Sequence, residues 1–240
     1  MSFWDHLEDL RKSIIRVVLA LVGATVFLFL FKNFLFDGII LAPADGKSIF
    51  FRLIGADFSI DLVNLEGAAQ FMIHMKVTFI CALILTFPYL VFELWRFVAP
   101  ALYEKEKGAV RGAFSFASIL FYAGLAVGYF IILPVMLNFF AGYQVSAEVP
   151  NTFSLSSYIS LFTSTIMTFG LVFEFPTIVA ILSALGLVTR EMMREYRRHA
   201  ICAVVIVAAL ITPSGDPFSL LVCTVPLYIL YEFSILVCKK

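Results

Sequence analysis

Residues 71–98 read FMIHMKVTFICALILTFPYLVFELWRFV, and this stretch decides the fold class. Its charged side chains are confined to Lys76 near one end and to Glu93 and Arg96 near the other. About 20 apolar residues in a helix are enough to cross the hydrocarbon core of a bilayer. The alternating ten-residue segments of a transmembrane barrel are missing from the sequence. Because lipid cannot satisfy open backbone groups, the stretch predicts a transmembrane α-helix.

Similar apolar runs lie on both sides of this stretch. Together they predict six spans, at residues 13–34, 71–98, 109–137, 156–185, 197–211 and 218–238. The fifth run is short, since the dozen apolar residues from Ala200 to Ile211 cover only about 18 Å as a helix. Prolines inside the even-numbered spans, Pro88, Pro176 and Pro226, predict kinks and therefore a curved bundle. The predicted fold is an all-α polytopic membrane protein with one domain over residues 1–240.

The composition supports a membrane location. Of the 240 residues, 62% are hydrophobic and 14% are charged, and the mean hydropathy is +0.99. Soluble domains are about 45–50% apolar and about 25% charged. The excess apolar surface must therefore face lipid. The formal net charge is zero, and we expect no nucleic-acid partner.

The distribution of lysine and arginine predicts the orientation. Of the 17 basic residues, all but Lys32, Lys47, Arg52 and Lys76 fall on one side of the six predicted spans. Basic residues are enriched in cytoplasmic loops. The sequence therefore predicts a protein of the cytoplasmic (inner) membrane with both termini in the cytoplasm and a periplasmic loop at residues 35–70.

Motifs for catalysis or metal binding are missing from the sequence. It contains no HExxH, GxSxG, P-loop or dinucleotide fingerprint. The four cysteines lie in or beside apolar runs and form no CxxC pair, which is typical of buried apolar residues. We therefore expect no enzyme activity, no metal and no cofactor.

Two polar segments flank the first two spans. Phe3, Leu7 and Leu10 have helical spacing, which predicts an amphipathic helix at the membrane surface with Asp9 among its polar residues. Residues 96–107 alternate in charge around Pro100. Both segments have a simpler structural explanation, because acids favour a helix N-terminus and alternating charges are typical of a solvated face.

Two carboxylates lie inside apolar runs. Glu174 is well inside the fourth span, where a charged side chain costs about 2.5 kcal/mol or more on insertion scales. Such residues face the bundle interior, and a functional role is the default hypothesis for them. A hydrogen bond to a neighbouring helix is the structural alternative. Glu232 lies nearer the cytoplasmic end of the last span, where it can reach water more easily.

Four segments in order carry a resemblance to a known family. They are HLEDLR at residues 6–11, FVAPALYEKE at 97–106, the run from Phe121 to Pro134, and FGLVFEFP at 169–176. The first two are similar to the HLxELR and F-x-x-PALY-x-x-E elements of the TatC family, the multispanning subunit of the twin-arginine protein translocase. The resemblance covers about His6 to Glu232, nearly the whole chain.

The resemblance implies a receptor for twin-arginine signal peptides of folded proteins. Asp9 and Glu106 match the acidic positions that bind the two arginines. The implied signal-peptide site further includes Leu10, Arg11, Phe97, Pro100, Leu102 and Tyr103. Glu174 and Glu232 match intramembrane polar positions linked to partner contact. The implied partners are single-span TatA- and TatB-type proteins in a hetero-oligomeric complex, with transport driven by the proton-motive force.

Some positions depart from the family pattern. Position 9 is Asp where Glu is usual, and Leu220 stands where a polar residue is often found. Two other functions remain open from the residues alone. One is a proton-coupled secondary transporter that uses Glu174, although the two halves of the chain show no convincing inverted repeat. The other is an intramembrane enzyme, which the missing nucleophile and metal motifs disfavour.

Overall fold

The computed structural model describes residues 3–44, 59–101, 104–146, 148, 152–212 and 216–238, which are mainly helical. The elements are α1 (Phe3–Phe29), α2 (Lys32–Leu35), the π-helix η1 (Phe36–Ile40), β1 (Leu62–Val63), α4 (Ala69–Val98), the 3₁₀ helix η2 (Ala99–Ala101), α5 (Glu104–Val127), the π-helix η3 (Gly128–Ile132), α6 (Leu133–Gly142), β2 (Phe153–Ser154), α7 (Leu155–Val172), α8 (Phe175–Ala184), α9 (Arg190–Glu195), α10 (Arg197–Ile211) and α11 (Pro217–Val237).

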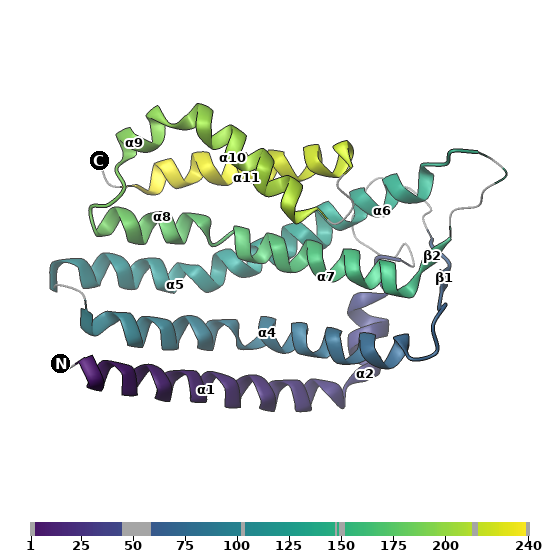
Figure 1. The fold of residues 1–240 in the computed structure, drawn as a ribbon, viewed down its shortest axis with the longest axis horizontal. Coiled ribbons are helices and arrows are strands. Elements are labelled where there is room, and N and C mark those ends of the chain that lie inside the picture. The colour runs from purple at the N-terminus through teal and green to yellow at the C-terminus, as the bar shows by residue number, and fades with distance from the viewer. Residues whose placement is uncertain are drawn as a thin grey trace.

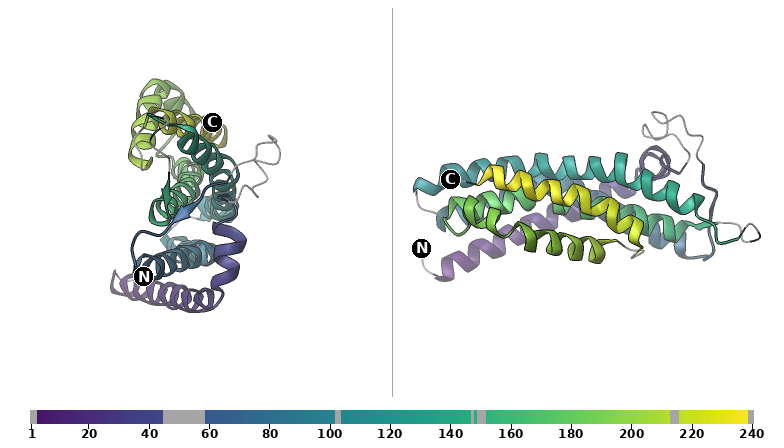
Figure 2. Two further views of the ribbon diagram at one scale, coloured as in Figure 1. Left: turned by 90° about the vertical axis from the view of Figure 1, so that its right-hand side faces the viewer. Right: turned by 90° about the horizontal axis from the view of Figure 1, so that it is seen from above.

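The long helices run antiparallel to one another in a row (Figure 1). Helix α1 lies at one edge of the row and α10 at the other, and α4 lies between α1 and α5 (Figures 1 and 2). Both chain termini lie at the same end of the molecule. We call this the terminal end, and the end that carries β1 and β2 the strand end.

Five helical stretches are long and apolar enough to cross a membrane among the residues that the structure describes. They are Leu7–Phe29, Ala69–Val98, Val110–Gly142, Leu155–Ala184 and Pro217–Val237. Their positions match five of the predicted spans to within a few residues at most boundaries. Helix α10 occupies the predicted fifth run and has 15 residues, about 22 Å of helix. Five of the six predicted spans therefore meet the length and composition of a membrane helix.

The first helix differs from the sequence-based expectation at both ends. The predicted surface helix is no separate element, because α1 runs without interruption from Phe3 to Phe29. The helix ends five residues earlier than predicted, and the apolar residues that follow form α2 and η1 instead. Ile40 in η1 is fully buried, and the Tyr158 hydroxyl donates a hydrogen bond of 2.5 Å to its carbonyl oxygen. This part of the apolar run packs against the bundle.

A small parallel sheet of two-residue strands, which the sequence did not predict, adds to the mainly helical fold. Leu62 in β1 pairs with Phe153, and Val63 pairs with Ser154 in β2. Ser154 also caps α7, since its hydroxyl accepts a hydrogen bond of 3.1 Å from the Ser157 amide. Strands of two residues carry little signal in a sequence, because their pairing depends on two distant segments meeting at the strand end.

The third and fourth spans are each interrupted just before a proline. Pro176 cannot donate to the carbonyl of Val172, and α7 ends at Val172. Pro134 likewise follows η3, where the chain changes direction between α5 and α6 (Figure 1). By contrast, α4 and α11 continue through Pro88 and Pro226. Of the three prolines predicted to kink a span, Pro176 therefore lies at a break between two helices, and Pro88 and Pro226 lie inside continuous helices.

Close packing of α5 on α7 fixes the break in the fourth span. A Cβ atom added at Gly124 would collide with the Phe169 carbonyl oxygen and the Phe173 ring. One added at Gly170 would lie 2.8 Å from Leu125 and 2.9 Å from the Phe121 ring. Only glycine allows these backbones to approach so closely. The contact holds the segment before Glu174 against α5.

Candidate functional site

The candidate site lies at the terminal end, where the start of α1, the end of α4 and the start of α5 meet (Figure 1). Asp9 and Arg11 are exposed on α1. Leu10 on α1 and Phe97 on α4 are half-buried, and both line a cavity of about 240 Å³ between the two helices. The structure therefore brings together these two apolar residues of the predicted signal-peptide site and places an exposed carboxylate next to one of them.

Glu93, which lines this cavity, is buried and forms an ion pair with partly exposed Arg16. Arg16 donates two hydrogen bonds to Glu93, from Nε to Oε1 at 2.9 Å and from Nη2 to Oε2 at 2.7 Å. The Glu93 side chain is only 3% exposed. Arg16 Nη2 also donates to Ser13 Oγ at 2.9 Å, and the Tyr89 hydroxyl donates to Glu93 Oε1 at 3.2 Å. We call Ser13, Arg16, Tyr89 and Glu93 the Arg16–Glu93 cluster.

Sequence reasoning missed this cluster. In the sequence, Glu93 and Arg16 are two of the charged residues near the predicted cytoplasmic ends of the first two spans, and neither is singled out by a motif. The available signal was that both side chains are charged, opposite in sign, and set inside apolar runs that neighbour each other in the chain. A charge in such a position needs a partner, and the nearest antiparallel helix is the first place to look for it.

Other residues of the predicted site are placed less completely. Pro100 is exposed in η2, which continues the last turn of α4. Glu106 belongs to the first turn of α5, but its side chain lies outside the described part of the structure. Leu102 and Tyr103 also fall outside the described residues. The joint action of Asp9 and Glu106 therefore stays a prediction.

Glu174 lies at the break between α7 and α8, where it is the residue before the first turn of α8. Its side chain is half-buried, and its Oε1 atom is buried with no hydrogen-bond partner among the residues that the structure describes. The same holds for the hydroxyl of Thr177, one turn further along α8. This carboxyl group therefore retains the capacity to bond a group outside the chain.

Glu232 on α11 has partners within the chain. Arg197 Nη2 donates to Oε2 at 2.6 Å, and the Tyr228 hydroxyl donates to Oε1 at 3.0 Å. The pair joins the start of α10 to the last turns of α11 and is partly exposed. Its geometry explains how a carboxylate is accommodated near the end of an apolar helix.

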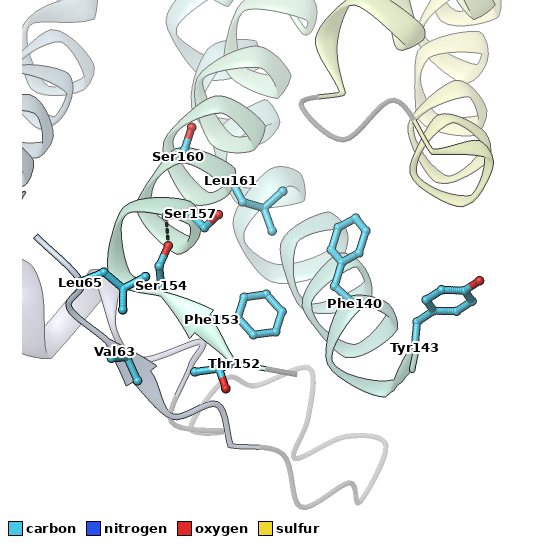
Figure 3. A pocket seen from close by; sticks show the side chains of 10 residues that line it. All are labelled: Val63, Leu65, Phe140, Tyr143, Thr152, Phe153, Ser154, Ser157, Ser160 and Leu161. Atoms are coloured by element: carbon cyan, nitrogen blue, oxygen red, sulfur yellow. Dashed lines mark hydrogen bonds between the residues drawn. The ribbon is translucent and has the colours of Figure 1, made fainter. Parts of the chain in front are cut away.

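A larger cavity, of about 850 Å³, lies at the strand end between α6, α7 and the two strands. Figure 3 shows the rings of Phe140 and Phe153 facing this space, with Ser157 and Ser160 along one wall. None of the residues predicted for the signal-peptide site lines it. A residue that lines this cavity can therefore serve as a control for experiments on the candidate site, because it lies at the opposite end of the molecule.

Among the described residues, no group of three His, Cys, Asp or Glu side chains could hold a metal ion. An exposed carboxylate beside an apolar cavity suits an extended ligand with a cationic group followed by apolar side chains.

Comparisons with known proteins give the chain a family. Residues 5–226 match the family model described as Sec-independent protein translocase protein (TatC). The chain is 37% identical over 250 residues to the TatC protein of Blattabacterium sp. subsp. Periplaneta americana, with 98% of this chain and 94% of the relative covered. It is 32% identical over 243 residues to TatCy of Bacillus subtilis, with 100% of this chain and 89% of the relative covered.

Solved structures agree with this result. The chain matches the crystal structure of the twin-arginine translocase receptor TatC with a TM-score of 0.77 at 29% identity, covering 97% of each chain. A second crystal structure of that receptor, in DDM, gives a TM-score of 0.81 at 28% identity, covering 98% of this chain and 100% of the other.

Proposed function

The chain belongs to the TatC family of Sec-independent protein translocase proteins, and from this membership we propose that it is the receptor for twin-arginine signal peptides. It is a multi-pass membrane protein with a role in protein transport. The solved relatives carry the words translocase receptor in their descriptions, which supports the proposal.

One observation carries the proposal: exposed Asp9 directly precedes Leu10 in α1, and Leu10 lines a cavity between α1 and α4 together with Phe97. A twin-arginine signal peptide presents guanidinium groups followed by an apolar stretch. Carboxylates bind guanidinium through paired, charge-assisted hydrogen bonds. Because an exposed ion pair alone contributes little, useful affinity also requires the apolar contact. The arrangement offers both within one short segment of α1 and α4.

The remaining predicted residues complete the proposed site. Glu106, on the first turn of α5, supplies the second carboxylate. Leu102 and Tyr103, which lie outside the described residues, and Pro100 in η2 are assigned to apolar contact with the peptide, and Arg11 contributes a hydrogen-bond donor on the exposed face of α1.

The proposed topology has six crossings with both termini in the cytoplasm. Two observations support it. The first is that both termini lie at the same end of the molecule. The second is that Lys32 and Lys76, two of the four basic residues predicted on the periplasmic side, lie away from that end, at the start of α2 and in the first turns of α4. In this topology α10 crosses as the short fifth span, in the cytoplasmic membrane of the cell.

Glu174 and Glu232 are the proposed contacts for TatA- and TatB-type single-span partners. The buried Oε1 atom of Glu174, which lacks a partner in the described chain, supports this role for Glu174. Polar groups hydrogen-bond across helices in membranes. We place the chain in a hetero-oligomeric complex of one or more copies, in which the proton-motive force drives transport of folded cargo.

Photo-crosslinking tests where the signal peptide binds. A photoreactive residue replaces Phe97 in one variant and Tyr143, exposed at the strand end, in a matched control. Membrane vesicles with each variant receive a precursor whose signal peptide carries Arg-Arg or Lys-Lys. We expect an adduct from position 97 with the Arg-Arg precursor only. Equal adducts from both positions, or from both precursors, would contradict the proposed site.

A further inference from the structure

Helix α1 lies at the edge of the bundle, and few of its side chains are buried. Between Leu7 and Phe29, Ser13 is the one buried side chain of the helix. Its main contact is α4 (Figure 1). Because lipid tails are as apolar as leucine, the hydrophobic effect does not hold apolar faces of two membrane helices together, and their register depends on close packing and polar contacts. Something polar or close-packed must set where α1 lies along α4.

The Arg16–Glu93 cluster supplies such a constraint. A planar guanidinium that bonds both oxygens of one carboxylate fixes angle as well as distance. Ser13 and Tyr89 add further hydrogen bonds from the same two helices. Near the strand end, Phe29 stacks on His74 of α4 at 4.1 Å between ring centroids. The helix is thus held at two points, and only the first is close to the candidate site.

Helical spacing connects the cluster to the candidate site. Arg16 follows Asp9 by seven residues, which places both on nearly the same face of α1. Glu93 precedes Phe97 by one turn of α4, and both line the cavity with Leu10. A shift of α1 along α4 would therefore move Asp9 and Leu10 away from Phe97.

We propose that Arg16 and Glu93 are positioning residues that hold α1 in register on α4 and so keep the proposed signal-peptide site assembled. The part that concerns the signal peptide rests on the proposed function. The part that concerns the position of α1 stands without it. Arg16 also bonds both oxygens of Glu93, so that exposed Asp9, and not Glu93, is left for an arginine of a ligand.

Distance measurements by pulsed electron paramagnetic resonance test the position of α1. In a variant without the native cysteines, spin labels are attached at Leu19→Cys on α1 and Leu236→Cys on α11, both exposed positions. A second pair, Phe92→Cys on α4 with Leu236→Cys, serves as the reference for helices that should not move. Each pair is measured in nanodiscs, in parallel with binding of Arg-Arg and Lys-Lys signal peptides to unlabelled protein.

The variants are Glu93→Gln, Arg16→Gln and the exchange Arg16→Glu with Glu93→Arg. Lys12→Gln is the matched control, because Lys12 pairs with Glu8 at 2.9 Å on the exposed face of the same helix. We expect each single variant to broaden or shift the α1–α11 distances, leave the α4–α11 distances unchanged, and weaken Arg-Arg binding about tenfold. The exchange should restore much of both, and Lys12→Gln should change neither.

Unchanged α1–α11 distances in Glu93→Gln would overturn the proposal, and would do so even if peptide binding were lost. If the unaltered protein shows no preference for Arg-Arg peptides, the proposed function fails, and the distances still decide the position of α1. If the neutral variants do not fold, Arg16→Lys keeps the charge but loses the paired geometry. A broadened distance distribution in Arg16→Lys then supports the proposal, and an unchanged one contradicts it.

Discussion

The carboxyl group of Glu174 combines two features at a single residue: it sits where a membrane helix breaks, and one of its oxygens is buried without a partner among the described residues. A group of this kind is costly unless something bonds it. The proposed partner helix would do so.

Substitution of Glu174 distinguishes partner contact from proton transport. Glutamine keeps the hydrogen-bonding capacity and alanine removes it, so we expect Glu174→Gln to retain a single-span partner and Glu174→Ala to bind it about fivefold more weakly. Co-purification at graded partner concentrations measures this. Ser164→Ala on α7 is the control, since its hydroxyl bonds the carbonyl of Leu161 in its own helix. Proton transport instead needs an ionisable group, so partner binding that is unchanged in both Glu174 variants, together with equal loss of proton-coupled uptake in both, would favour the transporter.

Residues differ in how far the sequence predicts their role. Glu174 could be singled out because its depth in an apolar run is visible in the sequence. The pairing of Glu93 with Arg16 could not, because a sequence shows the face of each helix but not the register between two helices. The same limit applies to Glu232, whose bond to Arg197 depends on how α10 lies against α11.

At the scale of elements, the positions of the spans were largely predictable, because long apolar runs have few other structures open to them. The ends of the helices were less predictable. The end of α1 at Phe29 depends on packing of the following residues under Tyr158, and the strands depend on contact between distant segments. The uninterrupted α4 and α11 show that a proline inside a span does not by itself end the helix.

The close contact between α5 and α7 leads to a prediction about stability at the scale of elements. Gly124→Ala forces a methyl group against Phe169 and Phe173 and should destabilise the protein by about 1–3 kcal/mol. Gly112→Ala on the same helix meets nothing within 4 Å and should leave stability unchanged or slightly raised. Thermal unfolding of both variants in detergent measures the difference. Equal midpoints would show that the close approach of α5 to α7 is not needed.

At the scale of the whole molecule, the proposed arrangement of six passes depends on α10, the predicted span that is not among the five helices long enough to cross a membrane in the described part of the chain. Cysteine accessibility in the cysteine-free variant tests it. Val145→Cys and Pro217→Cys should react with an impermeant maleimide in intact cells, and Leu187→Cys only after permeabilisation; all three positions are exposed. Protection of Pro217→Cys alone would mean that α10 does not cross.

The account as a whole depends on recognition of paired arginines at the terminal end. The most direct measurement is calorimetric titration of the purified protein in nanodiscs with Arg-Arg and Lys-Lys signal peptides, repeated with Asp9→Ala and Glu106→Ala. We predict that the Arg-Arg peptide binds about tenfold more tightly and that each substitution removes most of this preference. Equal affinity for the two peptides, with a partner subunit present, would contradict the account.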